Sequence, residues 1–244
     1  MSSALAHDLD ERFPDVGALA AALETIGYLA GNQLAAALFL AVRMGQPILL
    51  EGEPGVGKTE AAKALASAID TPLVRLQCYE GIAAAEALYE WNYPRQLLAI
   101  RLAEAAVTIP ELGTQRAKLP PVTVLTSNRT RDLHDALKRR CLYHWIAYPD
   151  TPRVAEIVRR RVPAAGEELA GQIAAAVQRL RKLDLTKPPG ISEAISWASA
   201  LSVLGADELT SQAAGQTMST VLKYPEDEEM VRQAGLATVV GSLD

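Results

Sequence analysis

Cysteine and histidine are scarce in this chain of 244 residues, which holds two cysteines and three histidines. Cys78 and Cys141 lie far apart and show no C-x-x-C spacing, so the sequence indicates neither a disulfide framework nor a zinc site. The histidines, His7, His134 and His144, are scattered and suggest no metal site. We therefore expect a protein of a reducing compartment without a His or Cys metal site.

Long apolar runs and an excess of basic charge are also absent. No stretch approaches the roughly 18 apolar residues of a membrane span, and residues 1–13 lack the basic and apolar regions of a secretory signal. The 24 Lys and Arg face 29 Asp and Glu, a formal charge of −5, which argues against a broad nucleic-acid or anionic-membrane surface. We expect a soluble cytoplasmic protein with no nucleic-acid partner and no membrane contact.

Short apolar stretches alternate with helical patterns through residues 1–149. Strands are predicted at residues 47–51, 73–77 and 122–126. Helices are predicted at residues 16–28, 33–44, 58–68, 94–105 and 132–139, with Asn32 as N-cap of the second. This alternation is typical of an α/β domain in which a parallel sheet is flanked by helices.

The pattern changes after a turn-rich joint at residues 148–152. From there only helical spacing is found, at residues 152–161, 168–182, 192–204 and 209–222. We therefore predict an α/β domain over residues 1–149 and a smaller, all-helical subdomain over residues 150–244.

Residues 52–59 read GEPGVGKT, which matches the P-loop pattern G-x-x-x-x-G-K-[ST], with a predicted strand before it and a predicted helix after it. In this motif backbone N–H groups cradle phosphates at a helix N-terminus. Lys58 would reach the β- and γ-phosphates, and the Thr59 hydroxyl would ligate Mg²⁺. The sequence predicts ATP and Mg²⁺ as cofactors, with no N-K-x-D motif to read guanine. The residues expected around the nucleotide are Glu53, Pro54, Gly55, Val56, Gly57, Lys58, Thr59 and Glu60.

Asn128 follows the strand predicted at 122–126, at the edge of an open α/β sheet where ligands bind. A neutral amide there can orient water at a γ-phosphate, or it can simply turn the chain, and the P-loop favours the first interpretation. A local excess of positive charge follows it, made of Arg129, Arg131, Lys138, Arg139 and Arg140. These residues form a solvated helix face, an arginine finger for a neighbouring subunit, or a nucleic-acid patch.

Four segments resemble the AAA+ ATPases of the MoxR type, and within them the CoxD-like branch associated with carbon monoxide dehydrogenase maturation. They are PILLEGEPGVGKTEAAKALA, RLQCYEGIAAAEALYEWNYPRQLLAIRLAEA, VTIPELGT and PPVTVLTSNRTRDLHDALKRRCLYHWIAYP. The resemblance implies that Lys58 and Thr59 are Walker A residues and that Asn128 is sensor 1. It also implies that Arg140, with Arg139, acts as a finger across a subunit boundary, and that residues 150–244 form a lid.

The same resemblance implies a function. It suggests a homo-oligomeric ring, a hexamer, that hydrolyses ATP to remodel a client protein in the manner of a chaperone. The implied client is a metalloenzyme awaiting cofactor insertion, and the implied partner carries a von Willebrand A domain. For Tyr28 and Leu29 it suggests packing near adenine, with ordinary core residues as the alternative.

Two features of the family are missing. No apolar strand ends in Asp-Glu as a Walker B strand does; the nearest acid, Glu111, follows Pro110, which breaks the strand. A strand and two helices, roughly 45 residues, are missing near residues 105–107, and we favour an omitted segment over a true deletion. The sensor 2 position corresponds to Ala194, with Lys187 a weak substitute.

Three functions follow from these observations. The leading hypothesis is the client-remodelling ATPase described above. The second is a nucleotide-binding assembly protein that does not hydrolyse, as the missing Walker B strand would suggest. The third, a P-loop small-molecule kinase, is disfavoured by the segment LTSNRTRDLHDALKRRC and by the lack of an acceptor site.

Overall fold

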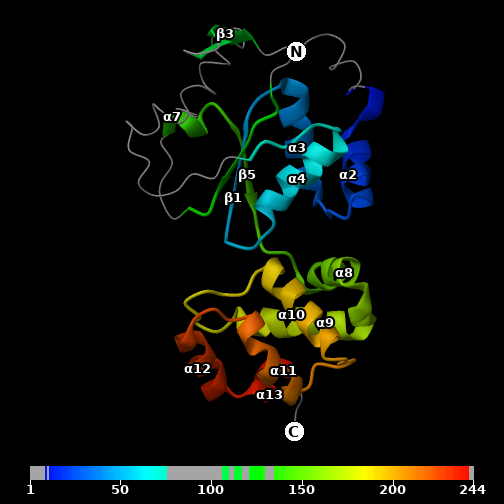
Figure 1. The fold of residues 1–244 in the computed structure, drawn as a ribbon, viewed down its shortest axis with the longest axis vertical. Coiled ribbons are helices and arrows are strands. Elements are labelled where there is room, and N and C mark those ends of the chain that lie inside the picture. Colours follow the sequence, from blue (N-terminus) through cyan, green and yellow to red (C-terminus); the bar gives the residue numbers. More distant parts are fainter. Residues whose placement is uncertain are drawn as a thin grey trace.

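The computed structural model describes residue 9 and residues 11–75, 106–109, 113–116, 121–129 and 135–241. Figure 1 shows an α/β part that holds the N-terminal helices and the sheet, and a separate helical part below it. The chain passes from one part to the other where strand β5 leads into helix α8. We call residues 151–240 the helical region.

A three-stranded parallel sheet forms the centre of the α/β part. Its strands are β1 (Ile48–Gly52), β4 (Val124–Ser127) and β5 (Leu142–Ile146), in the order β4-β1-β5. In this register Glu51 lies opposite Ser127 on one side and Trp145 on the other. All residues of β1 are buried, as expected for a central strand with neighbours on both edges.

Helices α3 (Asn32–Met44) and α4 (Lys58–Ala68) pack on one face of this sheet, and α2 (Val16–Thr25) packs against both of them. The Asp15 carboxylate caps α2 by accepting from the Ala18 N–H at 2.8 Å. Apolar side chains of the three helices pack against Ile48, Leu50 and Ile146 in one hydrophobic cluster. The opposite face carries Tyr143 and Trp145, which are 48% and 39% exposed.

The helical region has a hydrophobic core of its own. Its helices are α8 (Thr151–Arg161), α9 (Gly166–Leu180), α10 (Ile191–Val203), α11 (Ser211–Thr217), α12 (Pro225–Ala234) and α13 (Leu236–Val240), with short 3₁₀ turns at Pro163–Ala165 and Met218–Thr220. Trp197 is completely buried in this core, and its indole N–H donates to Thr217 Oγ1 at 2.7 Å. The bond satisfies the one polar atom of the largest core side chain.

The architecture confirms the predicted fold class, a parallel sheet flanked by helices with an all-helical part after it. Helix α4 begins and ends at the predicted residues, and the predicted boundary between residues 149 and 150 falls between β5 and α8. The helix predicted at 209–222 is in fact the shorter α11 followed by a 3₁₀ turn, and α12 and α13 were not predicted. Gly31, and not Asn32, is the N-cap of α3.

The strand predictions were less accurate. Residues 73–75 are not in a strand, and residues 76 and 77 lie outside the described residues. Strand β5 was not predicted; it forms by pairing along its whole length with β1, a contact between segments about 94 residues apart that the local pattern does not contain. Three predicted features lie wholly or partly outside the described residues: the helix at 94–105, Cys78, and residues 132–134 of the helix at 132–139. The described remainder of that last helix contains α7, Asp135–Lys138.

The region of the predicted missing segment holds a separate hairpin. Strands β2 (Ala106–Ile109) and β3 (Gly113–Arg116) pair antiparallel in a sheet of their own. Within the described ranges, β4 pairs with β1 alone, so its other edge has no strand partner there. Residue 105 lies outside the described residues, and the missing segment stays a prediction.

Candidate nucleotide-binding site

The P-loop lies between the end of β1 and the start of α4. β1 ends at Gly52, and Gly57, with φ 95°, is the N-cap residue from which α4 begins at Lys58. A Cβ atom on Gly52 would lie 2.4 Å from the carbonyl oxygen of Ile146, so only glycine fits between the loop and β5. The loop thus directs the N-terminus of an eleven-residue helix, with its free N–H groups and positive dipole, toward the site.

Lys58 lies inside the loop. The residue is 7% exposed, and its ammonium donates to the carbonyl oxygens of Gly52 at 2.8 Å and Glu53 at 2.7 Å. Burial lowers the pKa of Lys58, and the nearby negative charge of Glu53 partly opposes this effect. The cation is therefore held at the centre of the loop by backbone oxygens that a phosphate can replace.

The remaining residues expected around the nucleotide differ in exposure. Val56 is buried in the core, Glu53 and Pro54 are exposed, and Gly55 is half-buried. Thr59 and Glu60, in the first turn of α4, are half-buried.

Among the described residues, few side chains could hold Mg²⁺. No group of three or more His, Cys, Asp or Glu side chains that could hold a metal occurs among the described residues. Mg²⁺ commonly takes few protein ligands together with nucleotide phosphates and water. A site made of Thr59 and phosphates fits this chemistry.

The helical region touches the P-loop directly. The Ile191 N–H donates to the Gly55 carbonyl oxygen at 2.9 Å, and a Cβ on Gly55 would lie 2.9 Å from Gly190 Cα. Beside this contact, Arg181 Nη2 lies 2.5 Å from Glu53 Oε2. The α10 start is therefore seated on the nucleotide loop itself.

Arg181, an arginine of the helical region that pairs with Glu53, was not predicted from the sequence. Ala194, the expected sensor 2 position, is completely buried in α10 and carries no charge. The backbone N–H of Lys187, the weak substitute, donates to an Asp227 carboxylate oxygen at 3.1 Å. Arg181 follows α9, thirteen residues earlier than Ala194, and only the packing of α9 against α10 brings it to Glu53.

A second polar cluster lies where β1, β4 and β5 end. Glu51 is 2% exposed at its side chain; it accepts from Tyr143 Oη at 3.1 Å and pairs with Arg129 Nε at 3.2 Å. The Arg129 guanidinium also lies 5.4 Å from the centre of the Trp145 ring. Burial is the main cause that raises the pKa of Tyr143, and its hydrogen bond to Glu51 raises it further.

Asn128 lies in the turn that this cluster fixes. It is exposed and directly follows β4, whose last residue, Ser127, is paired in register with Glu51 beside the P-loop. The next residue, Arg129, has a left-handed φ of 58°, and its N–H donates to Ser127 Oγ at 3.1 Å. The strand order therefore brings Asn128 and the P-loop to the same edge of the sheet.

Arg139 and Arg140 lie apart from the P-loop of their own chain. Both are exposed in the turn between α7 and β5, where their N–H groups bond to Asp135 and Leu137. Among the described residues, no hydrogen bond or ion pair joins either guanidinium to residues 52–60.

Tyr28 lies against the other side of the loop. Its ring would be 3.9 Å from a Cβ on Gly57, and burial raises the pKa of its hydroxyl. It helps to line a cavity of about 150 Å³ together with Gly27, Glu60, Lys63 and Arg161 of the helical region, among others. Tyr28 also packs against the core of the α/β part, so the interpretation that it lies near the base stays a prediction.

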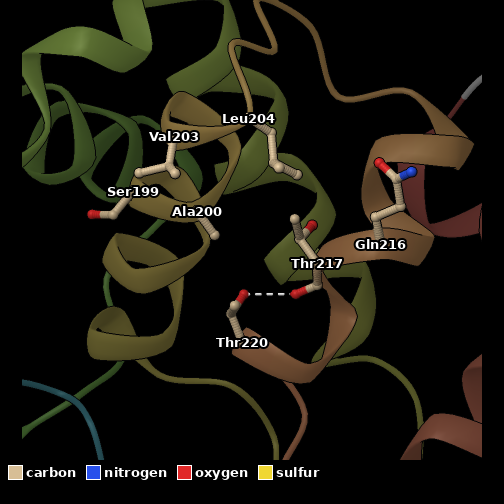
Figure 2. A pocket seen from close by; sticks show the side chains of 7 residues that line it. All are labelled: Ser199, Ala200, Val203, Leu204, Gln216, Thr217 and Thr220. Atoms are coloured by element: carbon tan, nitrogen blue, oxygen red, sulfur yellow. Dashed lines mark hydrogen bonds between the residues drawn. The ribbon is translucent and has the colours of Figure 1, made fainter.

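A larger hollow, about 380 Å³, lies within the helical region and away from the P-loop. Figure 2 shows that α10 and the α11 segment line it. Its lining residues are Ser199, Ala200, Val203, Leu204, Gln216, Thr217 and Thr220. They include no charged side chain.

Comparison with known proteins supports the P-loop assignment. The family model of the AAA domain, dynein-related subfamily, matches residues 47–109. No curated protein matches the chain.

Two similar solved structures illustrate the likeness. The RuvB Holliday junction branch migration motor of Thermotoga maritima is 20% identical with a TM-score of 0.44, over 77% of this chain and 66% of that chain. A structure that addresses katanin self-assembly is 16% identical with a TM-score of 0.42, over 98% of this chain and 86% of that chain. The present chain thus spans 66% of the length of the RuvB structure.

In the described residues, no helix has the length and apolar character needed to cross a membrane.

Three observations agree with one another: the glycine loop between β1 and α4, the parallel sheet, and the family match that includes β1 and the loop. The chain has the AAA+ P-loop NTPase fold, with an AAA domain matched over residues 47–109.

Proposed function

We propose that this protein binds ATP with Mg²⁺ at the P-loop, hydrolyses it, and uses the energy to remodel a client protein. The observation that carries the proposal is the buried Lys58 ammonium, held by the Gly52 and Glu53 carbonyls at the N-terminus of α4. A buried cation beside free helix N–H groups is a site for an anion, and phosphate is the anion that this loop type binds.

The residues around the loop have separate proposed tasks. Lys58 binds the β- and γ-phosphates, Thr59 contributes its hydroxyl to Mg²⁺, and the backbone of residues 53–60 donates to the phosphates. Mg²⁺ supplies charge neutralisation to the bound triphosphate. Asn128, at the same sheet edge, orients the attacking water.

The protein acts as a subunit of a homo-oligomeric ring, which we take to be a hexamer. Arg140 and Arg139 are exposed and lie apart from the P-loop of their own chain, which suits residues that serve a neighbouring subunit. An arginine supplied from outside can stabilise the charge of phosphoryl transfer.

Within the AAA+ proteins we assign the chain to the MoxR type and its CoxD-like branch, on the four sequence segments that resemble it. On this assignment the client is a cytoplasmic metalloenzyme awaiting its cofactor, and a protein with a von Willebrand A domain is the partner. Residues 150–244 serve as the lid.

The test is nucleotide binding and phosphate release by the purified full chain, with Lys58→Ala as the comparison. We expect wild type to bind ATP and release phosphate, with turnover per chain rising as protein concentration drives assembly. The Lys58→Ala variant loses binding, because the buried cation is removed. A wild-type protein that binds no ATP, or stays monomeric with ATP at unchanged turnover per chain, would contradict the proposal.

A second candidate is a nucleotide-binding assembly protein that does not hydrolyse. The observation that favours it is the edge of β4, which within the described ranges has no strand beside it to carry a Walker B acid. Intact mass separates the two candidates. A mass near 26.1 kDa favours binding alone, whereas a mass greater by roughly 5 kDa means that a strand and two helices belong to the protein and favours hydrolysis.

A further inference from the structure

Glu51 is a buried carboxylate to which the proposed function gives no task. Among the described residues of the α/β part, Glu51 and Lys58 are the charged residues that are buried. Glu51 directly precedes the P-loop, and burial of its carboxylate costs stability unless a cation and hydrogen-bond donors satisfy it. It has both, because Arg129 Nε lies 3.2 Å from its Oε2 and Tyr143 Oη donates to the same oxygen at 3.1 Å.

Arg129 has a backbone conformation that a residue with a side chain rarely adopts. Its φ of 58° is left-handed, and such a conformation persists only where the surroundings hold it. Its N–H donates to Ser127 Oγ at 3.1 Å, and its guanidinium pairs with Glu51. The guanidinium carbon also lies 5.4 Å from the centre of the Trp145 ring. Contacts from β1, β4 and β5 therefore hold Arg129 in this conformation.

Asn128 lies between two anchored residues. Ser127, before it, is paired with Glu51 in the register of β4 and β1. Arg129, after it, is bound to the Glu51 carboxylate. Glu51 thus holds one neighbour of Asn128 through the strand pairing and the other through its side chain. Since the P-loop begins at the next residue, Gly52, the same residue also fixes the distance from this turn to the loop.

We propose that Glu51, Arg129 and Tyr143 are positioning residues for Asn128 in ATP hydrolysis. Tyr143 orients the Glu51 carboxylate, Glu51 holds Arg129, and Arg129 holds the turn in which the Asn128 amide orients the attacking water. This inference rests on the proposed function, which gives Asn128 that task. The three residues act through Asn128 and not on the nucleotide, so they set the rate of the chemical step and leave nucleotide binding alone.

The proposal predicts a loss of turnover without a loss of nucleotide affinity. Glu51→Gln keeps the size of the side chain but removes the charge that holds Arg129, and Arg129→Gln removes the cation. Each should lower kcat about tenfold, a part of the roughly 100-fold that a displacement of about 1 Å can cost. Tyr143→Phe removes one hydrogen bond to Glu51 and should lower kcat about threefold. In all three variants KM and the affinity for a non-hydrolysable ATP analogue should stay at the wild-type values.

Asn128→Ala separates positioning from a general loss of structure. In this chain the amide to be positioned is absent, so adding Glu51→Gln should lower kcat no further. A structural effect of Glu51→Gln would instead lower kcat by the same factor with and without Asn128. Stability and turnover should also part in the double variant of Glu51→Gln and Arg129→Gln. It should regain stability over Arg129→Gln, because no unpaired charge is buried, but it should not regain turnover.

The experiment is phosphate release by the full chain with Mg²⁺ and saturating ATP, with single turnovers for the slow variants. Calorimetric titration with the analogue measures affinity, and urea unfolding measures stability. Arg232→Gln is the matched control, because it removes an exposed arginine that pairs with Glu229 on α12. Its kcat should equal that of wild type. Tyr143→Phe keeps the test usable if Glu51→Gln does not fold.

The outcomes separate this inference from the proposed function. If the three cluster variants release phosphate as fast as Arg232→Gln does while Asn128→Ala is slow, the cluster is only a structural tie. The inference is then wrong, and the proposed function stands. An equal loss of kcat on Glu51→Gln with and without Asn128 overturns the inference as well. If the wild-type chain releases no phosphate, the proposed hydrolysis falls and takes this inference with it.

Discussion

The P-loop and the turn around Asn128 lie at the same sheet edge but are held in different ways. The P-loop is enclosed by its neighbours, with β5 against Gly52 and the start of α10 against Gly55. The turn follows a strand whose residues are half-buried or exposed, and Asn128 itself is exposed. Among the described residues, Arg129 holds the turn through its ion pair with Glu51 and through its backbone N–H, which donates to Ser127 Oγ.

On the proposed function, this difference would separate nucleotide binding from catalysis. The geometry of the P-loop is determined by close backbone contacts, in which a single added carbon atom collides with its neighbour. The geometry that would orient water is determined by polar contacts at the surface, which solvent weakens. We therefore expect substitutions in the P-loop to act through steric collision with large effects, and substitutions in the turn to act through charge with smaller ones.

The largest effect is expected for Gly52→Ala. The new Cβ would lie 2.4 Å from the Ile146 carbonyl oxygen, a backbone atom that cannot move without displacing β5. The loop must shift instead, and a displacement of about 1 Å can cost about 100-fold in function. We expect ATP affinity to fall by about that factor, and overpacking to lower the free energy of unfolding by about 1–3 kcal/mol. Calorimetric titration and urea unfolding measure the two effects.

Gly171→Ala is the control for this substitution. Gly171 lies inside α9, and nothing lies within 4 Å of the Cβ that alanine would add. Alanine should stabilise the helix by about 0.5–1 kcal/mol and leave ATP affinity unchanged. Equal affinity in Gly52→Ala and wild type would mean that the loop is not confined by β5.

A smaller effect is expected for Arg129→Gln. The substitution leaves the buried Glu51 carboxylate without its cation, which lowers the free energy of unfolding by about 1 kcal/mol, because Arg129 itself is 58% exposed. Glu51→Gln in the same chain should recover part of the loss, since no buried charge then remains unpaired. Urea unfolding of both variants and of the double variant tests this. ATP affinity should stay near the wild-type value, and a loss as large as that of Gly52→Ala would erase the contrast between the loop and the turn.

Much of the binding half of this site could be predicted from the sequence, because it is local. The P-loop, the strand before it and the exact span of α4 lie within residues 47–68, where motif and periodicity agree. The position of Asn128 relative to the loop also followed, since residues after neighbouring parallel strands meet at one edge.

The contacts between distant segments could not be predicted. Arg181 and Glu53 are 128 residues apart, and Tyr143 and Glu51 are 92 apart, so no periodicity relates them. Strand β5 was missed although Tyr143, Trp145 and Ile146 favour strands, because its strand character depends on pairing with β1. In both cases tertiary packing supplies what local patterns lack.

The smallest effect concerns pH and His144, which lies on β5 opposite the buried Leu50. Burial lowers its pKa below the usual 6.5. The unfolded chain then binds more protons than the folded one between these two pKa values, so stability is complete above pH 6.5 and falls as the pH drops below it. His144→Gln should remove this part of the pH dependence. Urea midpoints of both proteins at about pH 7.5 and about pH 5.5 test it, since carboxylates shared by both chains cancel in the difference. An identical change of midpoint in both would show that His144 is as well solvated in the folded sheet as in the unfolded chain.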